Sequence, residues 1–588
     1  MSLTAILSQL FEDAFASQGL DPSYGAVVIS ARPDLAQFQC NGAMPAAKDA
    51  GKNPRQIARS VIESLDDNAP FADLDIAGPG FINITLTDDY IARYVDSLAA
   101  DSIGVTAAPD PKRKIVIDYG GPNVAKELHA GHLRPAIIGE SIKRIFRYLG
   151  HDVVGDVHLG DWGMPYGQLI AELADRQPEL PYFDENQVDG YASVSPVSID
   201  DLQTMYPEAS ARAKTDPEFA SRARAAVVAL QEGRPGYRAL WQHMRDISIE
   251  AIRTVYDRLN VEFDLWHGES TINHRLEPMV RRLLEQGLAI ESSGALIIEV
   301  MTDKDTKEVP PFLLLKSDGA SLYTTWDLAT IEDRVEELGA EEMIYIVDVR
   351  QSLHFEQVFR AAYKTGIAAP EVVLDHSGNG TVNGPDGKPF KTRDGGLLRL
   401  RDLIDMVVER AAQRLDENEL ATEFDEAEKA EIAEKVGLAA LKYGDLQNHR
   451  SSNYTFDIER FTSFDGKTGP YLLYGAVRMK SVLREATGRG IEAGTIVAPD
   501  REQERNLMLQ LTRLPEVVTR AAELRAPNHI AEYSYELVAD FSRFYEACHI
   551  LSEPDSSRQS SWLRLVETTL AELTLLLDLL GIEIPERM

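Results

Sequence analysis

The sequence predicts an α/β fold whose central part holds a parallel sheet, preceded by a small α+β domain and followed by a helical region. Between about residues 112 and 400, short apolar runs alternate with amphipathic stretches, which is the pattern of parallel strands joined by crossover helices. Residues 1–110 mix both periodicities with glycine-rich turns. From about residue 401 onward, helical periodicity prevails. These three observations define the predicted fold class.

The same changes of pattern indicate domain boundaries. We expect an N-terminal domain at residues 1–110, a central α/β domain at 111–400, a helical linker region at 401–455 and a helical C-terminal domain at 456–588. The central domain contains a long and largely polar insert at about residues 171–305, with proline-rich loops. Each of the larger parts is long enough to bury its own core.

The bulk composition is that of an ordinary soluble globular protein. Of the 588 residues, 44% are apolar and 26% are charged, and the formal net charge is −34. Such acidity argues against nonspecific coating of nucleic acid or binding to an anionic membrane, although local basic patches could still bind RNA. No apolar stretch has membrane-spanning length. Cys40 and Cys548 are too few for a disulfide framework or a cysteine-based zinc site, so we expect a cytoplasmic protein without a structural metal.

The individual elements are predicted from local periodicity. In the N-terminal domain we expect a helix at about Ile6–Phe15 and a strand at Phe81–Leu86. The insert carries a helical stretch at about Ala226–Leu259, after which the parallel sheet is expected to resume. The elements expected there are a strand at Phe312–Leu315, a helix from about Thr325 to Leu338, a strand at Met343–Val347, a helix through Phe355–Tyr363 and a last strand at Val372–Leu374.

The most informative stretch lies where a strand turns into a helix. The apolar run Ile115–Ile117 predicts a buried parallel strand, and glycines with a proline then force a loop. From Leu133 onward, apolar residues recur at helical spacing until Gly150 supplies a stop. The sequence His129–His132, which reads His-Ala-Gly-His, therefore lies at the N-terminus of a helix.

This position suits an anionic phosphate, because orphan backbone N–H groups and the helix dipole attract anions. Gly131 lets the backbone approach a ligand closely, since it has no Cβ. His129 and His132 can donate hydrogen bonds to phosphate oxygens as charge builds during nucleotidyl transfer, and Lys126 adds a point charge. The spacing fits neither a zinc-protease helix nor a Walker loop. Taken alone the four-residue pattern is weak, because two histidines near a helix start are often only caps or core residues.

The context makes the pattern specific. The segments Pro122–Lys126, His129–Arg134 and His158–Gly163 closely resemble those of arginyl-tRNA synthetases, which are class I aminoacyl-tRNA synthetases. Here His-Ala-Gly-His stands for the class's His-Ile-Gly-His. Gln39–Met44 and Ile76–Asn83 resemble the N-terminal extension of the same family, which contacts the outer corner of the tRNA. The resemblance spans essentially the whole chain.

This resemblance implies both a fold and a reaction. The fold is a Rossmann-like catalytic domain with a connective insert that holds the tRNA acceptor end, between an N-terminal tRNA-contacting domain and an all-helical anticodon-binding domain. In the reaction, ATP converts L-arginine to arginyl-adenylate, and the 2′-hydroxyl of the terminal adenosine of tRNA(Arg) then takes the arginyl group. Mg²⁺ is expected as the counterion of ATP, and activation is expected to need bound tRNA. We expect a monomer that makes no membrane contact.

The resemblance also assigns an arginine pocket. A guanidinium is planar, always charged and presents forked donors, so its receptor needs carboxylates with flanking neutral acceptors. Asp118, Tyr323, Asp327 and Gln351 could supply them, with Asn123 holding the amino-acid backbone. Without the resemblance, Asp327 would be better explained as an acid in the first turn of a helix and Tyr323 as a core aromatic. All five positions match residues that the family uses for arginine, which favours the functional interpretation.

A glycine- and proline-rich turn at residues 383–396 carries several cations. It could be a solvated basic hairpin. In class I synthetases a flexible Lys-Met-Ser-Lys-Ser loop closes over the departing pyrophosphate, and here that motif is degenerate. The resemblance aligns Lys391 and Thr392 with it, adds Lys388 as a further ATP contact, and implies that Lys126 compensates for the missing second lysine.

The C-terminal domain carries the expected tRNA contacts. A helix that opens at Lys467–Tyr474 resembles the anticodon-binding domain, and we expect Tyr471, Tyr474 and Arg478 to contact tRNA. No broad basic face is evident, so aromatic stacking with a few cations is expected rather than a general electrostatic footprint. For any single tyrosine, core packing is the alternative explanation.

Two other functions could explain parts of the same sequence. A non-catalytic tRNA-binding protein on the same scaffold would be favoured by loss of the histidines or of the acidic pocket, but both are present. A synthetase for lysine would not need the forked acceptors of Tyr323, Asp327 and Gln351, because lysine ends in a single ammonium. One position departs from the family: Asn379 precedes a glycine where an aromatic is common, which leaves the adenine contacts undefined.

Overall fold

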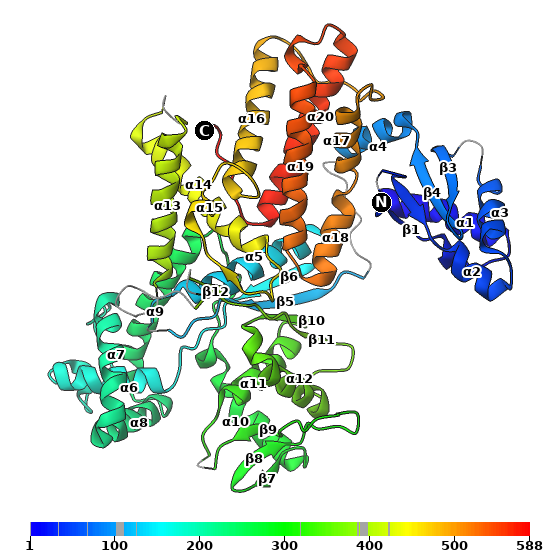
Figure 1. The fold of residues 1–588 in the computed structure, drawn as a ribbon. Coiled ribbons are helices and arrows are strands. Elements are labelled where there is room, and N and C mark those ends of the chain that lie inside the picture. The colour runs from blue at the N-terminus through cyan, green and yellow to red at the C-terminus, as the bar shows by residue number, and fades with distance from the viewer. Residues whose placement is uncertain are drawn as a thin grey trace. The chain divides into compact units, whose positions relative to one another are not determined.

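A computed structural model describes residues 2–32, 34–66, 69–100, 111–124, 126–317, 319–384, 387–388, 398–420 and 424–588 (Figure 1). The chain divides into two compact units. The first unit joins Met1–Ala108 to Phe464–Leu579 and Glu583–Met588, and the second comprises Pro109–Ser463 with Leu580–Ile582. Among the helices that the structure describes, none combines the length and the apolar character needed to cross a bilayer.

The second unit is built on a parallel sheet with the strand order β11-β10-β5-β6. The strands are β5 (Lys114–Tyr119), β6 (Asp152–Asp156), β10 (Glu342–Ile346) and β11 (Val373–His376). Beside them run the helices α5 (Leu133–Tyr148), α11 (Tyr323–Glu336) and α12 (Ser352–Thr365). The strand order reverses between β5 and β10, and open α/β sheets bind ligands at the carboxyl edge of such a junction. These elements confirm the predicted parallel sheet and its helices.

The strand at Phe312–Leu315 forms as β9, but the prediction that it belongs to the parallel sheet is wrong. It pairs antiparallel with β8 (Ala295–Ile298), which pairs with β7 (Ile290–Ser292) in a separate three-stranded sheet. Phe312 and Leu314 are buried, whereas Leu313 and Leu315 are only half-buried, which is the alternation of a sheet with one covered face. A short apolar run does not reveal which strand will be its partner.

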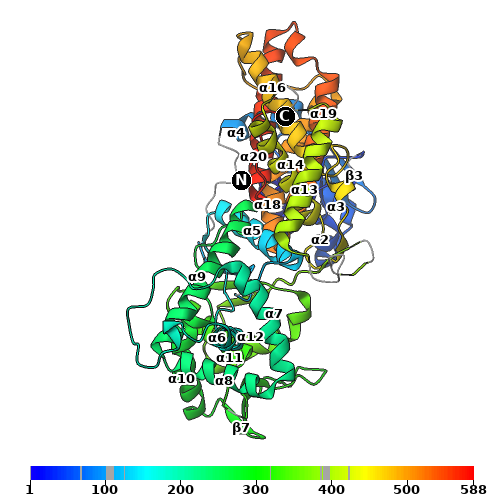
Figure 2. The same ribbon diagram turned by 90° about the vertical axis from the view of Figure 1, so that its left-hand side faces the viewer.

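The insert contains several helices, and the helical stretch expected at about Ala226–Leu259 forms as the end of one helix and the whole of the next. Residues 232–234 separate two helices there, because Gly233 adopts a φ of +88° and Pro235 cannot continue a preceding helix. The helices of this region are α6 (Met164–Arg176), α7 (Ile199–Thr215), α8 (Pro217–Gln231), α9 (Pro235–Arg258) and α10 (Glu269–Glu285). Figure 2 views α6, α7 and α8, which pack on one another.

The second unit ends in a helical region, as the sequence predicts. Its helices are α13 (Leu400–Glu417), α14 (Glu426–Leu446) and the short α15 (Ile458–Phe461). Helices α13 and α14 pack along each other (Figure 1). Two short strands, β12 (Val382–Asn383) and β13 (Tyr454–Thr455), pair in parallel and tie this region to the segment that follows β11.

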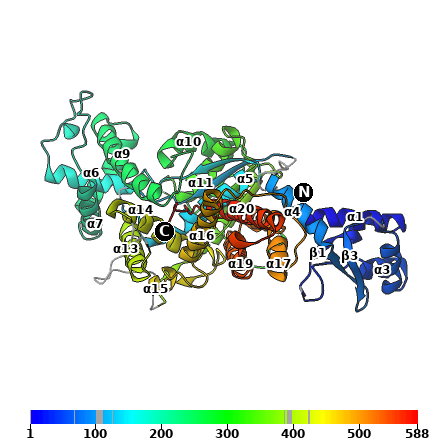
Figure 3. The same cartoon turned by 90° about the horizontal axis from the view of Figure 1, so that it is seen from above.

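The first unit combines a small sheet with a helical group (Figure 3). Its sheet has the order β1-β2-β4-β3, with β1 (Val27–Ile29), β2 (Phe38–Cys40), β3 (Phe71–Ala77) and β4 (Phe81–Leu86). Its other elements are α1 (Leu3–Ser17), α2 (Ala43–Ala50), α3 (Pro54–Glu63), α4 (Asp88–Ala100), α16 (Gly469–Gly488), α17 (Glu502–Leu511), α18 (Leu514–Leu524), α19 (Asn528–Ala547) and α20 (Ser556–Leu579). The helix near the N-terminus and the strand at Phe81–Leu86 form as expected.

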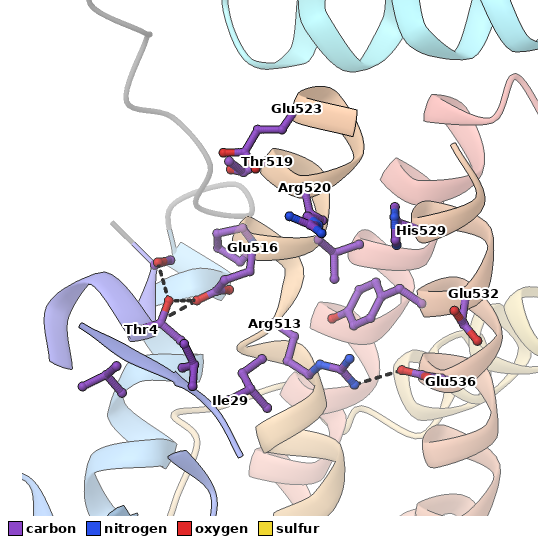
Figure 4. A pocket seen from close by; sticks show the side chains of 16 residues that line it. Thr4, Ile29, Arg513, Glu516, Thr519, Arg520, Glu523, His529, Glu532 and Glu536 are labelled. Carbon is purple, nitrogen blue, oxygen red and sulfur yellow. Dashed lines mark hydrogen bonds and ion pairs between the residues drawn. The ribbon is translucent and has the colours of Figure 1, made fainter. Parts of the chain in front are cut away.

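A pocket of about 670 Å³ lies within the first unit, between the start of α1, strand β1 and helices α18 and α19 (Figure 4). The Thr4 hydroxyl donates a hydrogen bond of 2.6 Å to Glu516 Oε1, and Arg513 forms a 2.9 Å ion pair with Glu536. The first turn of α1 contains no acidic residue of its own. Glu516 therefore supplies the negative charge that favours a helix N-terminus.

Candidate active site

A cavity of about 470 Å³ opens beside the junction of β5 and β10, at the carboxyl edge of the parallel sheet. Most of the predicted site residues of the second unit line it, namely Asp118, Asn123, Gly131, His132, Tyr323, Asp327 and Gln351. Residues that are 233 positions apart in the sequence, from Asp118 to Gln351, thus meet around one space. The cavity is large enough for a ligand of the size of an amino acid or a nucleotide.

The His129–His132 turn begins the helical region that α5 continues. Residues Ala130–His132 form a short 3₁₀ turn directly before α5. The backbone N–H of His129 donates to Nδ1 of His132 at 3.0 Å, and the N–H of Gly131 donates to Nδ1 of His129 at 3.1 Å. Because each Nδ1 accepts a hydrogen bond, the proton of each neutral ring sits on Nε2. Both imidazoles can therefore donate through Nε2–H.

The two rings are kept neutral by their surroundings. Burial and then the charge of Lys126 lower the pKa of His129. Burial, with a further contribution from His129, lowers the pKa of His132 to about 3. The ring centroids lie only 4.0 Å apart, an arrangement that two imidazolium ions would oppose. At neutral pH the turn thus presents two uncharged hydrogen-bond donors beside the positive end of a helix.

Gly131 is required by the histidine beside it. A Cβ at this position would lie 2.8 Å from Cε1 of the His129 ring, closer than real side chains approach. The absence of a side chain is therefore what allows the ring to fold back over the turn.

Asn123 lies at the cavity mouth, against the segment that follows β6. Val124 N–H donates to the Gly160 carbonyl at 3.0 Å, and Gly160 N–H donates to Pro122 at 3.1 Å. A Cβ at Gly160 would meet Asn123 Oδ1 at 2.4 Å. Two loops thus pack against each other, one carrying the Pro122–Lys126 motif and the other the His158–Gly163 motif. This contact explains why the two motifs occur together.

Asp118 shares a buried guanidinium with Asp156. The Nη2 atom of Arg334 lies 2.7 Å from Asp118 Oδ2 and 2.7 Å from Asp156 Oδ2, and the Arg334 side chain is only 2% exposed. Burial raises the pKa of Asp118 despite the attraction of Arg334. Burial also acts on Asp156, but there Arg334 prevails and the pKa is lowered. One guanidinium does not fully compensate both carboxylates, so Asp118 can still accept a second cation.

The residues from α11 and α12 face the same cavity. Asp327 Oδ2 lies 2.5 Å from Nε2 of His354, which fixes the carboxylate. Tyr323 lies one turn earlier on α11 and lines the cavity. It is 70% exposed, so it is not a core aromatic. Gln351 ends the short 3₁₀ turn after β10 and is also exposed. The position of Tyr323 removes the main structural alternative that the sequence left open for it.

Three comparisons with known proteins bear on this geometry. The family model "tRNA synthetases class I (R), catalytic domain" matches residues 95–458, "DALR anticodon binding domain" matches 472–588, and "Arginyl tRNA synthetase N terminal domain" matches 1–86. The arginine–tRNA ligases of Alkaliphilus oremlandii and Maricaulis maris are each 48% identical to this chain, over 99% and 100% of both chains respectively. The chain belongs to the arginyl-tRNA synthetases. The predicted family, fold class and ligase activity are confirmed.

A solved relative extends this conclusion to the fold. The arginyl-tRNA synthetase of Plasmodium falciparum superimposes with a TM-score of 0.82 at 25% identity, covering 100% of this chain and 99% of that one. The agreement therefore includes all parts of the synthetase and is not limited to its catalytic domain.

Sequence reasoning missed two acidic residues of this synthetase's cavity, Asp348 and Glu269. Glu269, in the first turn of α10, lines the cavity beside Tyr323 and Asp327. Burial, together with the nearby Asp161 and Asp327, raises its pKa to about 8. The sequence offered no signal for it, because an acid at a helix start is usually a response to the helix dipole.

Described residues on both sides of Lys391 and Thr392 make backbone hydrogen bonds. The Ala130 N–H donates to Leu398 at 2.8 Å, and the Leu400 N–H donates to Leu128 at 2.8 Å. Thus the segment after the loop pairs directly with the His129–His132 turn, which is called the signature turn below. At the other end, Gly384 N–H donates to Lys388 at 2.7 Å. Lys388 is exposed and does not line the cavity, whereas Lys391 and Thr392 lie outside the described residues.

Asn379 gives the cavity a polar wall where the family commonly has an aromatic. It follows β11 and lines the cavity, and it is 4% exposed. Its Nδ2 donates to the Gly380 carbonyl at 3.1 Å, whereas its Oδ1 has no partner among the described residues. This oxygen is free to accept a hydrogen bond from a ligand.

The three predicted tRNA contacts of the C-terminal domain all lie on α16, next to tyrosines of α19. The Arg478 guanidinium lies 4.7 Å from the Tyr474 ring and 5.6 Å from the Tyr545 ring. Tyr471 packs against Tyr535 with centroids 5.6 Å apart. Tyr471, Tyr474 and Arg478 are all half-buried, so each keeps part of its surface in solvent. Aromatic faces next to a guanidinium suit base stacking.

Proposed function

We propose that this synthetase condenses L-arginine with ATP to arginyl-adenylate in the cavity at the β5–β10 junction. The arginyl group then passes to the 2′-hydroxyl of the terminal adenosine of tRNA(Arg). The arginine carboxylate attacks the α-phosphorus of ATP, and pyrophosphate leaves. The protein contributes positioning and electrostatic stabilisation, because neither step needs a covalent bond to a side chain.

One observation supports this proposal most strongly: the two Nδ1 atoms of His129 and His132 accept backbone hydrogen bonds. The Nε2–H groups are thereby left to bind phosphate oxygens, and the hydrogen bonds that orient them exist without a ligand. A neutral donor costs little to desolvate and becomes more strongly bound as negative charge grows on the phosphate. The neighbouring helix N-terminus and Lys126 act on the same charge.

The acidic wall of the cavity supports arginine as the amino acid. Asp327 is oriented by His354, and Glu269 lies close enough to Asp327 for their charges to interact. We assign Asp327 and Glu269 to the guanidinium, with Tyr323 and Gln351 as neutral acceptors. We assign Asn123 to the amino-acid backbone. Asp118, one oxygen of which already pairs with Arg334, offers only its second oxygen.

We propose that Mg²⁺ enters with ATP and is not held by the protein alone. Within the part of the chain that the structure describes, no group of three or more His, Cys, Asp or Glu side chains is arranged to hold a metal ion. When bound to ATP, the ion supplies charge neutralisation for the leaving pyrophosphate. We assign tRNA binding by the anticodon-binding domain to Tyr471, Tyr474 and Arg478, and expect a cytoplasmic monomer.

The proposal is tested by arginine-dependent exchange of pyrophosphate into ATP, measured with and without tRNA(Arg), beside a His129→Ala variant. Exchange that requires tRNA and is lost in the variant supports both the reaction and tRNA-gated activation. Exchange without tRNA would retain the reaction and remove the gate. A protein that binds tRNA but shows no exchange under either condition would instead be a non-catalytic binder.

Arginine binding is expected to release a proton from Glu269. The raised pKa of about 8 means that this carboxyl is mostly protonated at pH 7 in the empty cavity, and a guanidinium favours its charged form. The KM for arginine should therefore fall as pH rises from 7 to about 8 and level off above it. Calorimetry at pH 7 in buffers of different ionisation enthalpy would measure the released proton. In Glu269→Gln both effects should vanish; a proton release that persists in this variant would assign it elsewhere.

A further inference from the structure

Lys126 is held by an aromatic side chain of the connective insert. Its Nζ lies 4.8 Å from the centroid of the Tyr206 ring, although the two residues are 80 positions apart. Both side chains line a second cavity of about 380 Å³, which Lys214 also borders. Lys126 is exposed and Tyr206 is half-buried. This distance lies within the range in which a ring attracts an ammonium group.

The lysine makes no ion pair within the described residues, even though an acid is its direct neighbour. Glu127 is occupied by Arg399, at 2.8 Å. A carboxylate partner would cancel most of the ammonium charge, whereas an aromatic ring restrains the group and leaves its charge uncompensated. That charge extends to the signature turn, because Lys126 contributes to the lowered pKa of both His129 and His132. Lys126 is thus restrained in a position from which it can still act on a phosphate.

The position of the Tyr206 ring is set by helix α7. Ser198 caps this helix, accepting from the Asp201 N–H, and the buried Leu202, Met205 and Ala209 anchor it. Tyr206 follows Met205 directly, so the backbone that carries its ring moves with α7. A shift of α7 would therefore displace the ring and change the restraint on Lys126.

We infer that Tyr206 is a positioning residue, whose ring holds the Lys126 ammonium beside the signature turn and thereby links the connective insert to ATP activation. This inference rests on the proposed role of Lys126 toward phosphate. It assigns no contact between Tyr206 and a substrate. What matters is the aromatic face, not the hydroxyl, because Lys126 lies over the ring.

The test compares Tyr206→Leu with Tyr206→Phe in pyrophosphate exchange at saturating arginine and tRNA. The leucine variant should lower kcat/KM for ATP by about two- to fivefold, the worth of one exposed cation–π contact, and leave the KM for arginine unchanged. The phenylalanine variant, which keeps the ring face, should restore the wild-type value. In a Lys126→Ala background, Tyr206→Leu should cause no further loss.

A second measurement detects the contact between Lys126 and Tyr206 without relying on enzyme activity. Lys126 is acylated with a limiting amine-reactive ester in the ligand-free protein, and its labelling rate is followed by mass spectrometry with Lys214 as the internal reference. Labelling of Lys126 should rise in Tyr206→Leu and not in Tyr206→Phe. Tyr237→Leu is the matched control, because Tyr237 lies under Arg234 at 4.1 Å in the same insert and does not contact Lys126.

The possible outcomes separate the inference from the proposed function. Equal losses from Tyr206→Leu in the wild-type and Lys126→Ala backgrounds, or unchanged labelling of Lys126, would overturn the inference. So would a Tyr206→Phe variant as impaired as Tyr206→Leu. If Lys126→Ala itself leaves exchange intact while labelling responds to Tyr206, the contact exists but the phosphate role of Lys126, and with it the positioning role, is refuted.

Discussion

Replacing His132 by asparagine is expected to lower the rate of arginine-dependent pyrophosphate exchange by about 10²–10³, the usual cost of one preorganised donor to a transition state. The asparagine Oδ1 can take over the position of Nδ1 and accept the His129 N–H, which now donates to His132 at 3.0 Å. The variant thus keeps the turn and loses only the Nε2–H donor. Exchange kinetics at saturating ATP and arginine would measure the loss.

His132→Gln is the matched control. Glutamine is longer and can place its Nε2 amide near the imidazole Nε2, but it supplies no acceptor at the Nδ1 position. We expect it to retain more activity than asparagine while weakening the turn, which thermal unfolding would report. If the asparagine variant exchanges like the wild type, the Nε2–H of His132 has no role in phosphate binding.

Asp327→Asn is the second change with a large expected effect. Removing the charge from a carboxylate that pairs with a guanidinium typically costs about 2–5 kcal/mol, so kcat/KM for arginine should fall by about 30- to 4000-fold. The KM for ATP should change little, because we assign this residue to arginine and not to ATP. Citrulline, a neutral isostere of arginine, gives the sharper measurement: competition by citrulline should be weak in the wild type and relatively stronger in the variant.

The control for this variant is His354→Gln, because Asp327 also accepts from His354 at 2.5 Å. Removing that partner disturbs the orientation of the carboxylate but leaves its charge. We expect a smaller loss for arginine and no change in the relative binding of citrulline. Equal effects of the two variants would mean that Asp327 acts on the local structure and not through its charge.

The local sequence was sufficient to predict a structural element wherever one short segment carried all the information needed for it. The strand Ile115–Ile117, the loop and the helix from Leu133 could be predicted because their apolar spacing and their breaking residues are contiguous. The position of the His129–His132 turn at a helix start followed from the same pattern. The family could be recognised because its motifs are short, ordered and chemically constrained, as Gly131 illustrates: any side chain there would strike the neighbouring ring.

Local sequence patterns could not predict which strands pair or which charged residues become buried. Phe312–Leu315 was predicted as a strand of the parallel sheet, but it pairs antiparallel with β8. The prediction failed because an apolar run does not indicate which strand will pair with it. Arg334 and Glu269 are ordinary helix residues in the sequence. Only folding brings Arg334 between two carboxylates and partly buries Glu269 near Asp161 and Asp327, and this burial is the main cause of the raised pKa of Glu269.

By itself, then, the sequence determined the order of most elements, the family and the chemical groups that we propose for arginine and ATP. The tertiary structure alone decided which nitrogen of each histidine is free, how Asp118 is occupied, and that Tyr206 reaches Lys126 across the insert. The reason is physical. Helical and strand periodicity act over a few residues, whereas tautomers, ion pairs and burial depend on groups that become neighbours only when distant parts of the chain pack together.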